Sequence, residues 1–332
     1  MASDSETAPP DRSVIPPKMH LSTSNPENRS SYFTASTKHI LKLARARLKK
    51  CVSIAPRLLV DDDPNDIHDL RVTTRRLQQV VSLLFPKPRY AKSRKVIRSL
   101  RDLRRDWSAC RNLDVNLALL HEKLESLDTD EARDAWNYVR GCLVELRARE
   151  LERARKRLRR LDILAFIKRT QRLLKAVEIE NVQELNLEES FADILAQWHE
   201  AVAQAKSRQN PKHLHELRIS GKRLRYRLEI IAELGNTAAK DQVNSLKALQ
   251  DDLGRWHDWH VLLQFVGKLI EKPKFVTDHP EFQQLLERDS DGERRKNNAA
   301  IGEILKQAET IQLGFDSCKE PLEQKTPSDG FN

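Results

Sequence analysis

The sequence predicts an all-α protein, and three features of its composition indicate this. Its 332 residues include only 9 glycines and 14 prolines, too few to separate many short strands. Arg, Leu, Glu, Lys and Ala dominate and 33% of the residues are charged, which is typical of amphipathic helices packed in bundles. No apolar run approaches the roughly 20 residues that a membrane-spanning helix needs. The composition therefore favours a helical protein and argues against an integral membrane protein.

The first half of the chain is predicted to hold a tail followed by helices. Residues 1–36 are rich in Ser, Pro, Thr and Asn, so we expect a disordered tail. A helical pattern then runs over about 37–56. The next helix has Asp63 at its N-cap and Pro64 at its first position, and it ends near residue 85 before two prolines. Further helices are expected at about 90–121, 130–160 and 162–176, and a polar linker at 178–190.

The second half of the sequence repeats the first. HELRISGKRL, which starts four residues after Pro211, matches HDLRVTTRRL four residues after Pro64, with an offset of 147 positions. LKALQDDLGRWHDWHV likewise aligns with LRDLRRDWSACRNLDV at an offset of 146. This duplication predicts two homologous helical units, each a four-helix bundle, at about 37–176 and 186–315. The domain would span 37–317, and a polar tail would follow at 318–332.

The positive charge is concentrated in the first half. The formal net charge is +10, but residues 38–175 alone carry +17, whereas residues 176–332 carry −6. Like charges gathered on one surface repel each other unless solvent or a counter-charge compensates them. The asymmetry therefore favours a polyanionic partner, and a solvated basic face is the alternative.

The repeated motif has a chemistry of its own. In both copies a His, an Arg and a further base lie at positions i, i+3 and i+7, which share one side of a helix. Leu70 and Leu77 of the first copy would lie on the opposite side, facing a core. Guanidinium groups donate forked hydrogen bonds that suit phosphate oxygens, lysine adds a flexible point charge, and imidazole adds a pH-dependent donor. The two helices together would therefore suit a phosphate-rich ligand.

These residues resemble the CHAD domain, a histidine-bearing α-helical family. The resemblance covers about residues 37–315 and rests on PNDIHDLRVTTRRLQQVVSLLFP and PKHLHELRISGKRLRYRLEII. It implies two four-helix bundles related by pseudo-twofold symmetry, with a central basic groove that binds inorganic polyphosphate; some members associate with polyphosphate granules. The Arg-Asp pair that ends the family's second helix stands here as Arg111-Asn112 and His257-Asp258.

The predicted ligand-binding residues come from the second and third helices of both repeats. The first-rank residues are His68, Arg71, Arg75, Arg76, His215, Arg218, Lys222 and Arg223. The second-rank residues are Arg225, Lys240, Lys247 and the stripe formed by Arg94, Arg98, Arg101 and Arg105. Four like charges within three helical turns are unfavourable without a partner, which favours a ligand-facing role for that stripe.

Other functions fit the sequence less well. Nucleic acid or another polyanion is the main alternative ligand, because its phosphates would use the same cations; however, only 5% of the residues are aromatic and available for base stacking. A metal-binding adaptor for phosphate-handling enzymes is less favoured, since arginines surround the histidines and no acidic or thiolate ligands stand at suitable spacing. No Gly-rich phosphate loop, GxSxG or HExxH occurs, so we expect neither enzymatic activity nor a cofactor. Four separated cysteines and an acidic, proline-containing start predict a cytoplasmic protein.

Overall fold

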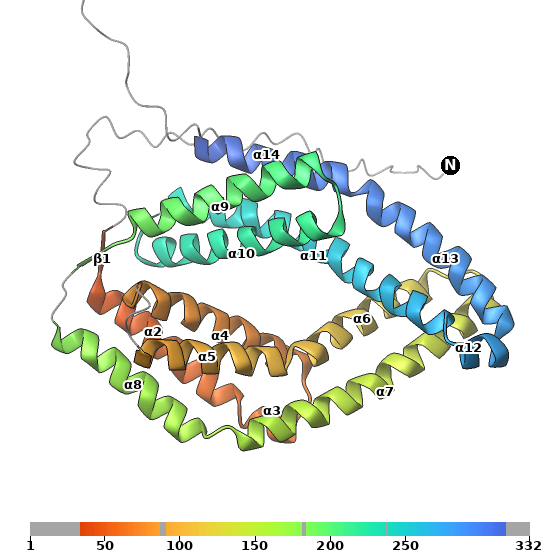
Figure 1. Cartoon of the computed structure of the whole chain (residues 1–332), viewed down its shortest axis with the longest axis horizontal. Coiled ribbons are helices and arrows are strands. Elements are labelled where there is room, and N and C mark those ends of the chain that lie inside the picture. Colours follow the sequence, from red (N-terminus) through yellow and green to blue (C-terminus); the bar gives the residue numbers. More distant parts are fainter. Residues whose placement is uncertain (1–33, 87–90, 181–183, 237, 317–332) are drawn as a thin grey trace, which may run out of the picture.

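The part of the chain that the structure describes is helical apart from its connections and two short strands, as the sequence predicts (Figure 1). The structure is a computed structural model that describes residues 34–86, 91–180, 184–236 and 238–316. Most of the predicted N-terminal tail and the predicted C-terminal tail lie outside the described residues. The elements are β1 (Thr34–Ser36), α2 (Thr37–Ile54), α3 (Arg57–Val60), α4 (Pro64–Leu84), α5 (Ala91–Asp106), α6 (Ser108–Glu125), α7 (Asp130–Arg160), α8 (Ile163–Ile179), β2 (Glu184–Asn186), α9 (Glu188–Ser207), α10 (Pro211–Glu233), α11 (Ala238–Ile270), α12 (Pro273–Asp278), α13 (Pro280–Ala299) and α14 (Ile301–Asp316).

Two groups of four helices lie one above the other in Figure 1. In the lower group α2 and α8 pack against α4 and α5, and in the upper group α9 and α14 pack against α10 and α11. A continuous apolar core runs through both, with Leu77 of α4 and Leu224 of α10 fully buried. The two helices that carry the repeated motif thus each bury an apolar side. That the two groups are copies related by pseudo-twofold symmetry stays a prediction.

A third helical group lies at the far end of the molecule and was not predicted. Here α6, α7, α11 and α13 pack around a second core that contains Trp136 and Leu262, both fully buried. The helix α11 is long enough to belong to the upper group with its first half and to this group with its second half (Figure 1).

The helix predicted over 90–121 is in fact two helices. The break falls at Trp107, whose backbone (φ −99°, ψ 5°) leaves the helical region between α5 and α6. Its indole ring is fully buried among residues of α2, α3, α4 and α7, so the bend places this ring in a third apolar cluster. The apolar spacing of the sequence continues through Trp107, which is why the pattern gave no sign of the break.

The start of the folded part also differs from the prediction. Residues 34–36 fall within the predicted disordered tail but form β1, which pairs antiparallel with β2 of the predicted linker, Ala35 opposite Leu185. This pairing ties the beginning of the first half to the beginning of the second. The predicted N-cap is confirmed, because the side chain of Asp63 accepts a hydrogen bond from Asn65 N. Asn210 caps α10 in a similar way, since its side chain accepts a hydrogen bond from His213 N. Among the described helices, none combines the length and apolar character needed to cross a membrane.

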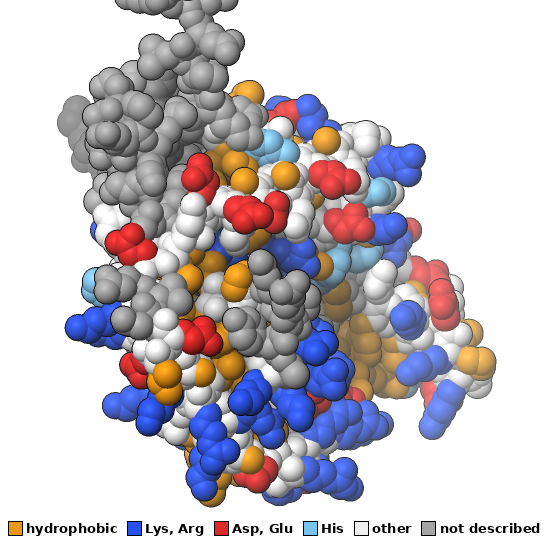
Figure 2. Space-filling view, turned by 60° about the vertical axis from the view of Figure 1, so that its left-hand side comes forward, with side chains coloured by type: hydrophobic (Ala, Val, Ile, Leu, Met, Phe, Trp, Pro, Cys, Tyr) orange, Lys and Arg blue, Asp and Glu red, His pale blue; other side chains and the backbone are white. Residues whose placement is uncertain are grey.

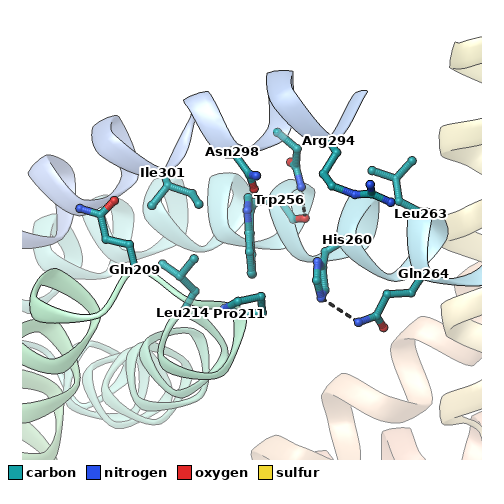
Figure 3. A pocket seen from close by; sticks show the side chains of 11 residues that line it. Gln209, Pro211, Leu214, Trp256, His260, Leu263, Gln264, Arg294, Asn298 and Ile301 are labelled. Atoms are coloured by element: carbon teal, nitrogen blue, oxygen red, sulfur yellow. Dashed lines mark hydrogen bonds between the residues drawn. The ribbon is translucent and has the colours of Figure 1, made fainter. Parts of the chain in front are cut away.

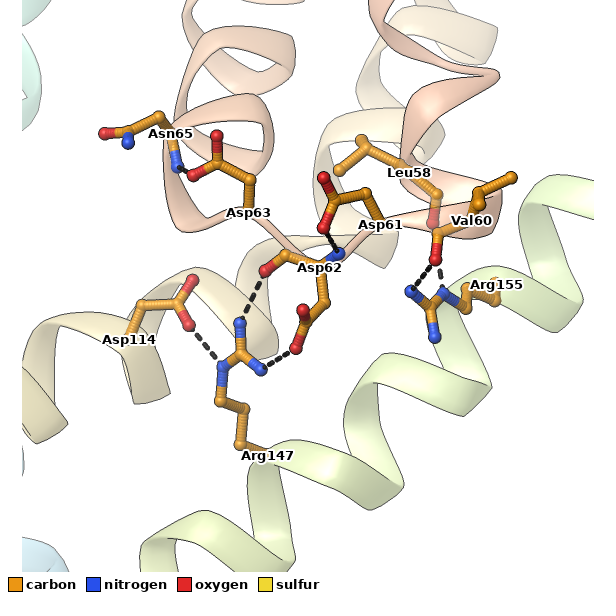
Figure 4. A network of polar contacts seen from close by, with 9 residues as sticks. All are labelled: Leu58, Val60, Asp61, Asp62, Asp63, Asn65, Asp114, Arg147 and Arg155. Atoms are coloured by element: carbon orange, nitrogen blue, oxygen red, sulfur yellow. Dashed lines mark hydrogen bonds and ion pairs between the residues drawn. The ribbon is translucent and has the colours of Figure 1, made fainter.

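An arginine clamp holds the turn that precedes α4 (Figure 4). Arg147 of α7 donates from Nε to Asp114 of α6 at 2.6 Å and from its two terminal nitrogens to the carboxylate and the carbonyl of Asp62, at 2.7 and 2.8 Å. The Asp114 side chain is only 3% exposed. One guanidinium therefore fixes the acidic turn, and with it the N-cap Asp63, against two other helices.

We predict that Arg147→Met strongly destabilises the fold, because it leaves the buried Asp114 carboxylate without its partner. Removing one member of a buried ion pair costs about 3 kcal/mol, which corresponds to a fall in Tm of roughly 6–12 °C in a domain of this size. Thermal unfolding measures it. Arg149→Met, which removes an exposed pair with Glu145 on the same helix, is the control and should change Tm by less than about 2 °C. Equal effects of the two variants would contradict the clamp.

Candidate polyanion-binding site

The two motif helices, α4 and α10, meet along their basic sides. Arg75 of α4 donates a hydrogen bond to the hydroxyl of Tyr226 on α10 at 3.3 Å, and its guanidinium lies 5.8 Å from the centre of that ring. Arg75 is close enough to Arg218 and Lys222 of α10 to lower the pKa values of both. Arg71 of α4 is likewise within electrostatic reach of Arg218. The predicted bases at i+3 and i+7 of both motifs are therefore brought together.

Two arginines from the bent pair of helices complete this group. Arg104 of α5 and Arg111 of α6 both act electrostatically on Arg71. We name the six cations together the central cluster: Arg71, Arg75, Arg104, Arg111, Arg218 and Lys222.

The break at Trp107 positions Arg71. The last carbonyls of a helix have no partner within it, and the end of α5 leaves the Arg104 carbonyl free to accept hydrogen bonds. Arg71 Nη1 donates to this carbonyl at 3.0 Å and also to Ser108 Oγ. Arg104 in turn donates to Gln78 of α4 at 2.9 Å. These bonds hold two like-charged guanidinium groups side by side with no carboxylate between them.

Histidines line one end of the central cluster. The rings of His215 on α10 and His257 on α11 lie 5.3 Å apart, and both act electrostatically with Arg218. His68 on α4 is influenced by Arg111, Arg71 and Lys222. Burial, followed by these neighbouring cations, lowers the pKa of all three imidazoles, that of His257 to about 3. In the free protein at neutral pH these imidazoles are therefore uncharged.

The central cluster is an unfavourable arrangement without a counter-charge. Burial, together with Arg218 and Arg75, lowers the pKa of Lys222 to about 6. Burial and neighbouring arginines also lower the pKa of Arg71 and of Arg104 to about 10. Among the described residues, Asp258 is the carboxylate that acts on both Arg218 and Lys222, and burial raises its pKa. Even with Lys222 largely uncharged at neutral pH, one carboxylate does not balance the five arginines, so the arrangement favours a ligand with several negative charges.

Several predicted site residues point elsewhere. Arg76 pairs with Glu229 at 3.0 Å, and Arg225 pairs with the other oxygen of the same carboxylate at 3.1 Å while lying over the ring of Tyr226. Arg223 donates to Gln197 of α9 on the outer side of α10. Arg76 and Arg223 therefore contact protein groups outside the central cluster, whereas Arg225 also acts electrostatically on Lys222.

The second-rank residues form an outer surface. Arg94, Arg98, Arg101 and Arg105 are exposed along α5, and Arg105 pairs with Asp102; of the four, Arg101 acts on Arg104 and so lies nearest the central cluster. Lys240 and Lys247 are exposed on α11. Figure 2 shows Lys and Arg gathered over the lower part of the face it presents, and Asp and Glu over the upper part. This division matches the charge difference between the two halves of the sequence.

Sequence reasoning missed Arg104, Arg111, Tyr226, His257 and Asp258 as site residues. A signal existed for Arg111 and His257, which occupy matching places at the offset of 146 residues. For Arg104 there was none, because six arginines lie on the helix predicted over 90–121 and their spacing does not say which of them faces α4. No group of three or more His, Cys, Asp or Glu side chains suited to holding a metal ion occurs in the part of the chain that the structure describes.

Comparison with known proteins places this arrangement in a family. The family model of the CHAD domain matches residues 42–267, which include both motif helices and the whole central cluster. This chain belongs to the CHAD domain family. The CHAD domain from the plant Ricinus communis has a TM-score of 0.56 and 18% identity, over 85% of this chain and 92% of that chain. PptA from Streptomyces chartreusis has a TM-score of 0.57 and 14% identity, over 85% and 98%. Both share the CHAD fold with this chain, and no match was found among curated proteins.

We predict that Lys222→Met stabilises the free CHAD domain, because it removes a partly buried cation from a repelling group. The pKa of Lys222 is about 6 in the folded chain and 10.5 unfolded, so the unfolded state holds more protons between these values. The lysine therefore costs most near pH 6, and its cost disappears as the pH rises toward 10.5. We expect Tm at pH 7 to rise by about 2–4 °C, equivalent to roughly 1 kcal/mol. Thermal unfolding at pH 6, 7.5 and 9 should show the gain shrinking with pH; a gain independent of pH would contradict this account.

Proposed function

We propose that this CHAD domain is a non-catalytic module that binds inorganic polyphosphate along the central cluster, between α4 and α10. The observation that carries the proposal is the gathering of six cations from four helices around partly buried positions with one carboxylate among them. Membership of the CHAD family supports it, because the family is associated with polyphosphate.

The chemistry of the cluster suits a linear polymer of phosphates. Arg71, Arg75 and Arg218 each offer several N–H donors in a planar fork, and charge-assisted hydrogen bonds to phosphate oxygens are among the strongest available to a protein. The Nε of Arg218 is buried and has no hydrogen-bond partner among the described residues. A repeating anion would supply acceptors and neutralise the mutual repulsion together, while releasing its own counterions. Binding of this kind would also bring the protein to polyphosphate granules.

The arrangement favours polyphosphate over nucleic acid. The aromatic residue in contact with the cluster is Tyr226, which is 3% exposed and lies beneath Arg75 and Arg225. Bases that stack on protein need exposed aromatic faces, and this ring offers none. A ligand that consists of phosphate alone needs no such face.

We expect the purified chain to bind long-chain polyphosphate more tightly than tripolyphosphate or DNA of matched charge. Affinity should fall steeply between about 50 and 200 mM salt, because ion release accompanies each phosphate contact. Titration calorimetry with polyphosphate, tripolyphosphate, and single- and double-stranded DNA measures the order. Equal or stronger binding of DNA would replace this proposal with general polyanion binding.

Charge reversal at Arg71 and Arg218 together should nearly abolish polyphosphate binding, whereas a single reversal should weaken it modestly because the contacts are distributed. Arg153→Glu with Arg159→Glu is the matched control, since these exposed arginines lie on α7 and pair with Glu150 and Glu152. Arg71→Gln with Arg218→Gln keeps polar groups at both positions, and thermal unfolding confirms that each variant folds. Full affinity in the folded Arg71 and Arg218 variants would rule out this site.

Polyphosphate binding is predicted to take up protons. Bound phosphates raise the pKa of Lys222 from about 6 and raise the lowered pKa values of His68 and His215, so these groups gain protons near neutral pH. Affinity should therefore be higher at pH 6 than at pH 8. Calorimetry in two buffers of different ionisation enthalpy counts the protons, and Lys222→Met should reduce the number. Proton release, or affinity that rises with pH, would contradict the assignment.

A further inference from the structure

A cavity lies beside the central cluster and takes no part in it (Figure 3). It is formed where the start of α10 faces α11, α13 and the first residue of α14, and its volume is about 410 Å³. Small-molecule sites in proteins typically measure about 300–1,000 Å³, so the cavity is large enough for a small organic ligand.

The cavity has two chemically different ends. Leu214 and Ile301 line one end, and His260 and Arg294 line the other, with the ring of Trp256 between them (Figure 3). Arg294 is exposed and pairs with Asp291 through one terminal nitrogen at 2.6 Å. The Trp256 and His260 rings are nearly parallel, with planes 10° apart and centres 5.4 Å apart. A flat, partly apolar molecule that carries a negative charge at one end would match this division.

Hydrogen-bonding groups in the cavity remain available. The Trp256 side chain is only 3% exposed, yet its Nε1 has no hydrogen-bond partner among the described residues. Buried indole N–H groups usually find an acceptor, so this one points to a missing partner. Gln209 and Asn298 add amide groups, which both donate and accept, whereas the Gln264 amide nitrogen already contacts His260 Nε2 at 3.0 Å (Figure 3). Such groups suit the edges of a heterocyclic base, which also carry donors and acceptors.

Imidazole groups connect the cavity to the central cluster. His260 lies one helical turn after His257 on α11 and acts on it electrostatically. The His257 ring lies 5.3 Å from that of His215, which is one turn before Arg218 on α10. A ligand with its ring in the cavity and a short phosphate chain at His260 therefore approaches the end of the central cluster.

We infer that this cavity binds a nucleotide, with the base beside Trp256 and the phosphates directed past Arg294 and His260 toward His257 and His215. A nucleoside triphosphate in this cavity would also occupy the end of the central cluster and compete with polyphosphate there. This competition rests on the proposed function. The base site itself depends only on the cavity.

The test compares adenosine triphosphate with tripolyphosphate on the full chain at 150 mM salt, because the two differ by the nucleoside. Burial of one base in the cavity and its hydrogen bonds to the lining groups should make the nucleotide bind about tenfold more tightly. Asn298→Trp, at an exposed position that lines the cavity, should fill it and remove this advantage without changing tripolyphosphate binding. Ala299→Trp, which places the same ring at the next, exposed position of α13, should leave both affinities unchanged.

Arg294→Gln should weaken nucleotide binding by about threefold to tenfold, and Arg288→Gln on the same helix should not.

Adenosine monophosphate separates this inference from the proposed function, because its single phosphate does not span the central cluster. Its binding should survive charge reversal at Arg71 and Arg218 and be lost in Asn298→Trp. Equal affinity for the triphosphate and tripolyphosphate, or an advantage that persists in Asn298→Trp, overturns the nucleotide site even if polyphosphate binds. Loss of polyphosphate binding alone overturns the proposed function and leaves the site standing.

Discussion

Repulsion between like charges held at partly buried positions is the constraint on which the rest of this structure depends. Arg71 and Arg75 on α4 face Arg218 and Lys222 on α10. Burial lowers the pKa values of Arg71, Arg218 and Lys222. The same two helices bury their opposite sides completely, at positions such as Leu77 and Leu224. Each fully buried leucine contributes about 2 kcal/mol of hydrophobic stabilisation. Helical periodicity thus lets one segment both stabilise the fold and carry the unfavourable charges.

The surrounding structure serves to keep that arrangement in place. A continuous helix across Trp107 would close the Arg104 carbonyl into its own ladder of hydrogen bonds, whereas the break leaves this oxygen to accept from Arg71. On the other side, Arg147 anchors the acidic turn whose Asp63 caps α4. The break at Trp107 and the Arg147 clamp both position α4 through polar contacts. Arg71 is therefore held in place without a carboxylate partner among the described residues. Rigid supports of this kind reduce the ordering that a bound ligand would otherwise require.

The sequence predicted much of the fold because local signals decide much of it. The Asp63-Pro64 and Asn210-Pro211 starts, the stops before Pro86 and the span of α7 follow from capping and periodicity, which act within a few residues. The third helical group could not be predicted, since an apolar side shows that a helix is buried but not against which helix. The break at Trp107 was hidden for a related reason: the ring satisfies the helical apolar spacing, while its burial among α2, α3, α4 and α7 is a tertiary fact.

For the candidate site too, local sequence patterns located the basic helices, but tertiary contacts decide which cations belong to it. Acidic residues make that decision. Glu229 is nearly buried and accepts from Arg76 with one oxygen and from Arg225 with the other, while Glu233 accepts from Arg47. These carboxylates balance the charges of Arg76, Arg225 and Arg47 within the protein. Arg104 and Arg111 join the site instead. Arg104 donates to the amide oxygen of Gln78, and Arg111 acts electrostatically on Arg71 and Asp258. The motif therefore specifies where cations gather, but the placement of Glu229, Glu233 and Asp258 decides which of them keep an unneutralised charge. The cations that keep their charge form an array along α4 and α10 rather than a single pocket. Only a ligand with repeated negative charges can place an acceptor at each of these cations.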